Sequence, residues 1–311
     1  MLLTHGASSA PLPPVALTVG NFDGLHRGHQ AMLQRLLDGA RARGLQSCVL
    51  TFEPHPREFF TAAAAPTRLT SLREKLELLA VHGVARTHVQ RFDRAFASLA
   101  PEAFVEQVLE KRLRARWLVI GEDFRFGTKR AGDVPLLKEL GGRHGFETEI
   151  LPAVSLSGVR VSSSAVRAAL AAGDLEAAEG LLGRPYSISG RVVHGRKLGR
   201  ELGFATANVQ LKHNRPPLSG IFAVRVHGVG TRSRPAVASL GVRPTITASG
   251  RAVLEVHLFD FSEDLYGAHM RVEFLHKIRD EKKYSNLDAL KAQIERDCKV
   301  ARTFLLENGN V

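Results

Sequence analysis

In the first half of the chain, short apolar runs alternate with segments whose apolar residues recur at helical spacing. The apolar runs predict strands, at VALTVG (15–20), SCVLTF (47–52), THVQRF (87–92) and RWLVIGEDF (116–124). The intervening segments predict helices: one with Met32, Leu33, Leu36, Leu37 and Ala40 on one face, then SLREKLELLAVHG (71–83) and PEAFVEQVLEKRL (101–113). This order is typical of a parallel sheet covered by helices, whose ligands bind beyond the carboxyl ends of the strands.

After LLGRPYSISG (181–190) the pattern changes to short segments of alternating polarity, separated by Gly, Pro and Ser. Strands are predicted at FATANVQL (204–211), GIFAVRV (220–226), AVLEVHLFDF (252–261) and MRVEFL (270–275). The pattern indicates a small antiparallel β-barrel. A closing helix is predicted over 287–306, with Leu287, Leu290, Ile294 and Cys298 at helical spacing.

The length of 311 residues, of which 44% are hydrophobic, agrees with two domains of roughly 100 to 200 residues each. We therefore expect an α/β protein with a parallel-sheet domain over 1–183, followed by a barrel domain with a C-terminal helix over 184–311. No apolar stretch approaches the roughly 18 residues that span a bilayer, and residues 1–14 lack the pattern of a leader peptide. We expect a cytoplasmic protein without a membrane partner. Its two cysteines, Cys48 and Cys298, suit structural thiols better than a disulfide framework or a zinc site.

The net charge of +12 raises the question of a nucleic-acid partner. Residues 1–183 carry 22 Lys and Arg against 19 Asp and Glu, whereas residues 184–311 carry 21 against 12. The surplus is scattered, and no run of five basic residues occurs in the sequence. The charge pattern therefore favours a small anionic substrate such as ATP over a nucleic acid.

The segment GNFDGLHRGH (20–29) lies where the first predicted strand ends and a helix begins. His26 and His29 are three residues apart, so they share one face at the helix start, where main-chain amides and the helix dipole already favour an anion. The glycines, Gly20 and Gly24 among them, let the backbone approach a nucleotide closely. A glycine turn with two capping histidines is the alternative, but the combination after a strand and before a helix favours phosphate chemistry.

This segment resembles the GxFDGxHxGH signature of the nucleotidyltransferase superfamily, whose histidine pair binds the phosphates of ATP. VSSSAVRAAL (161–170) resembles the superfamily's second phosphate motif, and together with GEDFRFGTKRAGD (121–133) and TFEPHP (51–56) the set resembles the FMN adenylyltransferase module of bacterial bifunctional FAD synthetases. The resemblance implies a Rossmann-like nucleotidyltransferase domain. The site residues that it implies are His26, His29, Arg167, Gly20, Phe22, Asp23, Gly24, Asp123, Ser163 and Ser164.

GRVVHGRKLGRELGFATANV (190–209) places a glycine-rich basic loop before a strand. In an extended strand Thr206 and Asn208 project to the same face, and they offer the oxygen ligands that Mg²⁺ prefers. The loop could hold ATP phosphates through Gly195, Lys197, Gly199 and Arg200. In the strand over 252–261 the apolar residues define one face, so Glu255 and His257 occupy the other, where a carboxylate near magnesium could accept a hydroxyl proton.

These segments, with SLGVRPT (239–245), DLYG (264–267) and KIRDEKKY (277–284), resemble the riboflavin kinase domain. The resemblance implies a six-stranded barrel, with Thr206 and Asn208 as metal and phosphate ligands and Glu255 as the base. One position departs from the family motif, because Ala205 stands where the family has proline. Alanine does not fix φ, so we expect a looser entry into the strand and a weaker kinase.

Together the two resemblances predict a bifunctional enzyme of flavin cofactor synthesis. The second half would phosphorylate riboflavin with ATP to FMN, and the first half would adenylylate FMN with ATP to FAD and pyrophosphate. The expected cofactor is Mg²⁺ with ATP, and the expected partners are ATP, riboflavin, FMN and FAD, with no nucleic acid. We expect a monomer or a weak homo-oligomer.

Two alternatives remain open. The first is a nucleotidyltransferase for another phosphate, such as phosphopantetheine, with the barrel as a flavin sensor; Glu255 and the ATAN strand argue against a sensor alone. The second is an RNA-binding or tRNA-charging protein, suggested by the net charge and by the histidine pair. The sequence contains no KMSKS-like segment and no stripe of aromatic and basic residues for stacking bases.

Overall fold

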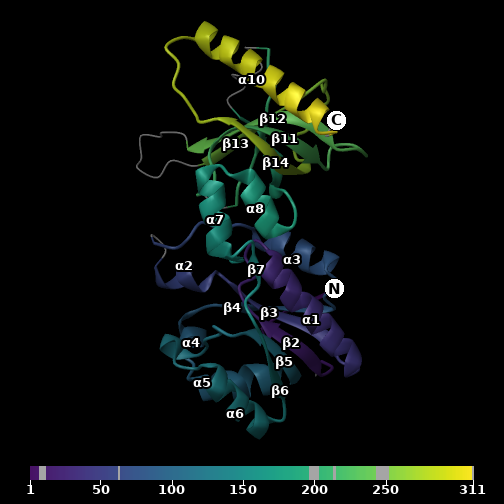
Figure 1. The fold of residues 1–311 in the computed structure, drawn as a ribbon, viewed down its shortest axis with the longest axis vertical. Helices are drawn as coiled ribbons and strands as arrows, with labels where there is room; N and C mark the ends of the chain where they lie inside the picture. The colour runs from purple at the N-terminus through teal and green to yellow at the C-terminus, as the bar shows by residue number, and fades with distance from the viewer. Residues whose placement is uncertain (7–11, 62–63, 196–202, 213–214, 243–251, 310–311) are drawn as a thin grey trace. The chain divides into compact units, whose positions relative to one another are not determined.

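The computed structural model describes residues 1–6, 12–61, 64–195, 203–212, 215–242 and 252–309 (Figure 1). The chain divides into two compact units. The first comprises Met1–Pro66 and Leu72–Ser162, and the second comprises Thr67–Ser71 and Ser163–Val311.

The first unit contains a six-stranded parallel sheet with the order β1-β4-β3-β2-β5-β6. Its strands are β1 (Leu2–His5), β2 (Val15–Val19), β3 (Gln46–Glu53), β4 (Arg86–Arg91), β5 (Ala115–Gly121) and β6 (Glu147–Leu151). Every residue of β2 is buried, as expected for a central parallel strand with helices on both faces. The GNFDGLHRGH segment follows β2 at the carboxyl edge of the sheet.

Helices cover both faces of this sheet. They are α1 (Arg27–Ala42), α2 (Pro56–Phe60), α3 (Leu72–Val81), α4 (Arg94–Ala97), α5 (Pro101–Phe104), the π-helical η1 (Val105–Arg112), the short η2 (Thr128–Arg130) and α6 (Val134–His144). A two-stranded hairpin, β7 (Ser155–Leu156) with β8 (Val159–Arg160), follows β6.

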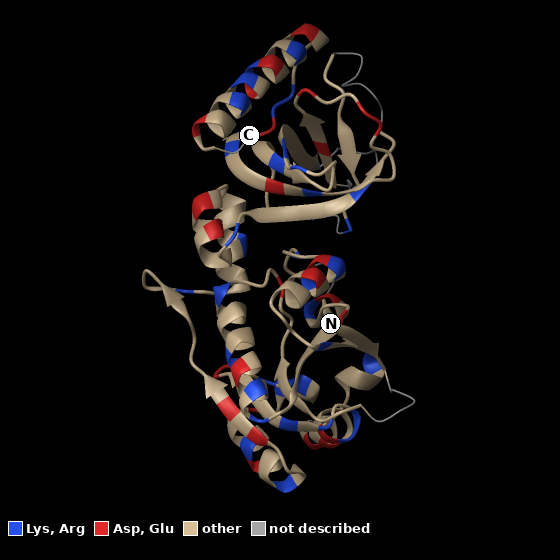
Figure 2. Cartoon of the chain, turned by 90° about the vertical axis from the view of Figure 1, so that its right-hand side faces the viewer, with Lys and Arg blue, Asp and Glu red and all other residues tan. Residues whose placement is uncertain are grey.

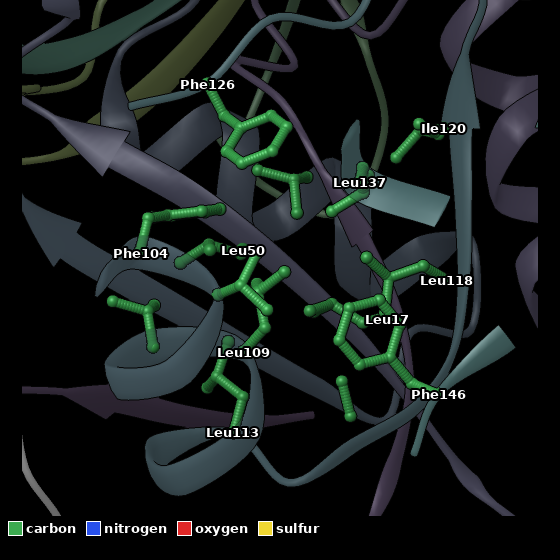
Figure 3. Close-up of a cluster of buried hydrophobic side chains, with 14 of the residues drawn as sticks. Leu17, Leu50, Phe104, Leu109, Leu113, Leu118, Ile120, Phe126, Leu137 and Phe146 are labelled. Carbon is green, nitrogen blue, oxygen red and sulfur yellow. The ribbon is translucent and has the colours of Figure 1, made fainter. Parts of the chain in front are cut away.

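Two apolar clusters fix these helices on the sheet. Figure 3 shows the cluster in which Leu109 and Leu137 of η1 and α6 point toward Leu17 and Leu118 of the strands. The other cluster contains Leu33 and Leu36 of α1 and Leu79 of α3, which pack against the sheet. Helix α1 approaches the sheet closely at Gly39, where glycine is needed. A Cβ atom at this position would lie only 2.3 Å from the Trp117 ring of β5. This packing fixes the position of the α1 start, where both motif histidines lie.

The second unit contains a closed six-stranded barrel with the order β10-β13-β12-β11-β14-β9. Its elements are α7 (Ser163–Ala172), α8 (Leu175–Leu182), β9 (Tyr186–Val193), β10 (Ala207–Val209), β11 (Gly220–His227), β12 (Arg234–Val242), β13 (Ala252–Leu258), β14 (His269–Arg279) and α10 (Leu287–Glu307). All its strand pairs are antiparallel. Helix α8 packs against β9 and β14 within this unit.

Helix α10 packs on the outside of the barrel through an apolar cluster and one ion pair. Cys298, Ala301 and Leu305 contact Ala223 and Val237 of the barrel strands in this cluster. The Arg279 side chain donates to the largely buried carboxylate of Asp297, with an Nη2–Oδ2 distance of 2.6 Å. Basic and acidic residues alternate along the rest of α10 (Figure 2).

The predicted fold class is confirmed: a parallel α/β unit is followed by an antiparallel barrel and a C-terminal helix. Two details of the prediction are wrong. The strand expected over 116–124 ends at Gly121, because the next residues form a turn closed by the Phe124 N–H bond to the Gly121 carbonyl. The strand expected over 204–211 is shortened to Ala207–Val209. Leu287 begins α10, as the helical spacing predicted, and its side chain is exposed.

Both cysteines are free and buried, which supports their interpretation as structural thiols. Burial raises the pKa of Cys48, and burial raises the pKa of Cys298 to about 11. Both thiols are therefore protonated at neutral pH and poorly suited to nucleophilic chemistry.

Candidate active sites

The turn between β2 and α1 brings the two motif histidines together. His26 is the N-cap of α1, and its Nδ1 accepts the main-chain N–H of His29 at 3.3 Å. The two rings are stacked, with centroids 3.7 Å apart and planes 16° apart. Because Nδ1 of His26 accepts a hydrogen bond, the ring proton lies on Nε2, where it can be donated to a ligand. The capping role and the ligand-binding role are therefore compatible in one residue.

Burial dominates the chemistry of His29. It lowers the pKa of His29 well below its ordinary value, and electrostatic interactions with His26 and Lys75 lower it further. Its Nδ1 is buried and has no hydrogen-bond partner among the described residues. His29 is therefore a neutral ring at physiological pH, able to donate a hydrogen bond to an incoming phosphate oxygen.

The backbone of the motif is shaped by close approaches. Gly24 has a φ of +81°, and Phe22 has a φ of +48°, although it is not glycine. The buried Phe22 ring packs beside the His29 ring, with centroids 5.0 Å apart. A Cβ atom on Gly28 would lie 3.2 Å from the His26 ring, and one on Gly20 would lie 3.1 Å from Phe22. Gly20 and Gly28 thus make room for the aromatic rings of the motif.

The two acidic candidates of the first unit differ in their surroundings. Asp23 is buried within the turn after β2. Asp123 follows β5 on an exposed turn, where its carboxylate accepts Arg160 Nη2 at 2.7 Å. A nucleotide that binds Asp123 would therefore compete with Arg160 or be bound together with it.

The second phosphate motif begins α7. Ser163 and Ser164 occupy its first turn, and Arg167 Nε donates to the Thr67 carbonyl oxygen at 2.5 Å. These residues belong to the second compact unit, whereas His26 and His29 belong to the first. That all five side chains serve one site stays a prediction.

In the barrel, strand pairing brings together two of the kinase candidates. Asn208 of β10 lies directly opposite Glu255 of β13 in the antiparallel register. Residues paired in this way project to the same side of the sheet. The alternation on β13 is as predicted, with Leu254, Val256 and Leu258 buried and Glu255 half-buried on the other face. Thr206 is half-buried and directly precedes β10.

The Asn208 side chain is packed beneath the start of the basic loop. A Cβ atom on Gly195 would lie only 2.2 Å from Asn208 Nδ2, so glycine is needed there for steric reasons. The other loop candidates, Lys197, Gly199 and Arg200, lie outside the described residues, as does the end of SLGVRPT.

The backbone before Thr206 is held by His257. His257 Nδ1 donates to the Ala205 carbonyl oxygen at 2.8 Å, and its ring packs edge-on against Phe204 with centroids 5.5 Å apart. A proline at position 205 would fix φ through its ring, whereas here a tertiary hydrogen bond restrains the neighbouring peptide. The hydrogen bond from His257 therefore restrains the backbone at Ala205, which the sequence had predicted to be loose.

Two further features of the first unit were missed from the sequence. Lys75 is a buried lysine on α3, 3% exposed, near His29. Phe59 and Phe60 are partly exposed and form edge-to-face contacts with Phe92. Exposed aromatic rings that follow a sheet strand can stack on a planar ligand ring. The run EFF in the sequence is the signal that could have identified these rings.

We predict that Gly195→Ala impairs phosphorylation of riboflavin by about tenfold or more, because the new methyl group must displace the Asn208 amide. Steady-state assays with riboflavin and MgATP measure the loss. The matched control is Gly142→Ala, because Gly142 lies within the helix α6 and a Cβ atom there would meet no other atom. Gly203→Ala is not an adequate control, because the φ of Gly203 is +90° and alanine would strain the backbone there. Wild-type kinase rates in Gly195→Ala would show that Asn208 is not required in its present position.

A parallel sheet with paired histidines beyond its edge, and a barrel with Asn208 and Glu255 in register, agree with the nucleotide-dependent transferase of two domains that the sequence predicts. A family model for FAD synthetase matches residues 9–165, and one for riboflavin kinase matches residues 182–305. The chain is 50% identical over 300 residues to the bifunctional riboflavin kinase/FMN adenylyltransferase of Escherichia coli K12, covering 96% of each chain. It is 46% identical to the protein of that name from Haemophilus influenzae, covering 96% of this chain and 97% of the other.

The chain therefore belongs to the bifunctional riboflavin kinase/FMN adenylyltransferase family. This membership confirms the prediction of a bifunctional transferase in flavin cofactor synthesis. The whole fold is also similar to a crystal structure described as a macrolide-efflux protein from Streptococcus pneumoniae. That similarity has a TM-score of 0.82 at 30% identity and covers 97% of this chain and 99% of that one. In the parts of the chain that the structure describes, no helix is both long enough and apolar enough to span a membrane.

Proposed function

We propose that Glu255 is the general base of the riboflavin kinase reaction. The terminal ribityl hydroxyl of riboflavin attacks the γ-phosphorus of ATP, the bond from that phosphorus to the bridging oxygen breaks, and Glu255 accepts the hydroxyl proton. FMN and ADP are the products. The observation that carries this assignment is the register that pairs Glu255 with Asn208, since it provides a carboxylate beside a phosphate and metal ligand.

The proposed cofactor of this step is Mg²⁺ bound with ATP. The donors fit such an ion, because the Thr206 hydroxyl and the Asn208 amide oxygen are hard ligands and Glu255 lies opposite Asn208. The described residues contain no cluster of three or more His, Cys, Asp and Glu side chains suited to a metal. Thr206 and Asn208 would thus hold the ion together with ATP phosphates rather than in a protein cage. When bound, Mg²⁺ neutralises charge on the phosphates.

In the FMN adenylyltransferase reaction, we propose that an FMN phosphate oxygen attacks the α-phosphorus of ATP and pyrophosphate leaves. His26 and His29 donate hydrogen bonds to the developing negative charge, and the first-turn amides of α1 add to its stabilisation. Arg167, Ser163 and Ser164 are proposed to bind the pyrophosphate. The FMN phosphate is already ionised at neutral pH, so this step depends on positioning and electrostatics and needs no base.

Nucleotide contacts are proposed for the remaining candidates. In the adenylyltransferase these are Gly20, Phe22, Asp23, Gly24 and Asp123, and in the kinase they are Gly195, Lys197, Gly199 and Arg200. We place the functional boundary between residues 183 and 184, near the start of the riboflavin kinase match at residue 182. We further propose a cytoplasmic monomer or weak homo-oligomer that acts on ATP and flavins and binds no nucleic acid.

The fate of each ATP phosphate tests the proposal. With riboflavin as the substrate, ATP labelled in the γ-phosphate should give labelled FMN and then labelled FAD. ATP labelled in the α-phosphate should label FAD but leave FMN unlabelled. Label from the α-phosphate in FMN, or no dependence of FMN formation on added Mg²⁺, would contradict the proposed chemistry.

A further inference from the structure

Lys75 occupies a position on α3 where the fold would favour an apolar side chain. It lies one helical turn before Leu79, and both residues face the core, with exposures of 3% and 0%. Taking an ammonium group out of water costs free energy, and charged residues are seldom buried without a compensating interaction. An apolar residue would fill this position without that cost, whereas the ammonium group brings a positive charge and three hydrogen-bond donors into the interior.

The contacts of Lys75 lead to the nucleotide-binding turn. Lys75 Nζ lies 3.4 Å from the Oγ1 of Thr51, which is fully buried on β3. The Thr51 hydroxyl in turn donates to the Asn21 carbonyl oxygen at 3.3 Å. The ammonium group has only donors, so Thr51 accepts from Lys75 and donates to Asn21. This series of contacts connects α3 to the turn that carries Phe22, Asp23 and Gly24.

A second effect of Lys75 reaches the same turn through its charge. After burial and the interaction with His26, the charge of Lys75 is the third cause that lowers the pKa of His29. Its electrostatic field therefore acts where the phosphates of ATP are proposed to bind. A positive charge fixed in a low-dielectric interior stabilises a developing anion more strongly than the same charge in water.

We propose that Lys75 is a positioning residue for FMN adenylylation, which holds the Asn21–Gly24 turn through Thr51 and adds positive charge to the phosphate-binding edge. The inference rests on the proposed adenylyltransferase role of this turn. The charge of this buried α3 lysine would add to the stabilisation proposed for the histidine pair, the first-turn amides of α1 and Arg167.

Three single variants and the double variant Lys75→Met/Thr51→Val test this inference. Lys75→Met, which keeps the length of the side chain without its charge, should lower kcat for FMN adenylylation by about tenfold or more. Thr51→Val, which removes the hydroxyl at nearly constant volume, should lower kcat in the same direction, and Thr51→Ser should restore much of the rate. In the double variant the two losses should not multiply, because both substitutions break one series of contacts.

An amide NMR spectrum of each variant reports whether the unit that contains Lys75 is folded, and Lys138→Met, at an exposed lysine of α6, is the matched lysine control. An NMR titration should also show a higher pKa for His29 in Lys75→Met. Wild-type kcat for adenylylation in Lys75→Met, or losses that simply multiply, would overturn the inference. If Lys75→Met did not fold, the kcat values of Thr51→Val and Thr51→Ser would test the inference, and equal kcat values for the two variants would contradict it. If the wild-type chain did not adenylylate FMN, the proposed function would fail instead.

Discussion

We expect Glu255→Gln to lower kcat for FMN formation from riboflavin by about 100-fold or more, the usual contribution of a general base. Glutamine keeps the shape of the side chain, so the pairing of β13 with β10 and the position of Asn208 should be preserved. What is lost is the carboxylate that accepts the proton of the ribityl hydroxyl. Adenylylation of supplied FMN should continue at close to the wild-type rate, because none of the residues proposed for that reaction lies in the barrel.

Initial rates with riboflavin and with FMN, each with MgATP, measure the two activities separately. Glu263→Gln is a suitable control, since Glu263 is an exposed glutamate shortly after β13. FMN formation at the wild-type rate in Glu255→Gln would show that another group accepts the proton. Loss of both reactions in a folded protein would show that the activities are not divided between the units as proposed.

His29→Ala should have the opposite effect and lower kcat for FMN adenylylation by about 100- to 1,000-fold, the range for removing one donor to a developing anion. The N-cap of α1 should survive, because His26 Nδ1 accepts the main-chain N–H of residue 29 and not its ring. The variant therefore removes the stacked, neutral imidazole while leaving the local hydrogen bond. Phosphorylation of riboflavin should be unchanged.

The same two assays measure this effect, and FMN should accumulate from riboflavin without conversion to FAD. His144→Ala is the matched control, because His144 ends α6 and pairs with Glu110 instead of lying in the nucleotide-binding turn. Undiminished FAD formation from FMN in His29→Ala would contradict the phosphate-binding role of the histidine pair.

The sequence predicted most of the parallel sheet, because its strands are continuous apolar runs and its helices have clear apolar faces. The run over 15–20 became β2, and the periodicity over 287–306 became most of α10. Two barrel strands were not predicted. β9 contains Ser187, Ser189 and Gly190, and β12 begins with Arg234 and Pro235, so neither shows the clean alternation of a strand.

The candidate site was predictable where adjacent residues carry the chemistry, and not where the fold brings distant residues together. His26 and His29 could be paired from their spacing alone. The opposition of Asn208 and Glu255 depends on barrel register, which motif resemblance suggested and strand pairing establishes. Lys75 and His257 make tertiary contacts with Thr51 and Ala205, and no local pattern in the sequence encodes such contacts.

The central claim is that this one chain makes FMN from riboflavin and then FAD from FMN. The most direct test is to incubate the purified protein with riboflavin and MgATP and to separate the flavins by chromatography over time. We predict that FMN appears first and FAD follows, with FAD forming without delay when FMN is supplied. If neither riboflavin nor supplied FMN were converted by the folded protein, the account would be contradicted.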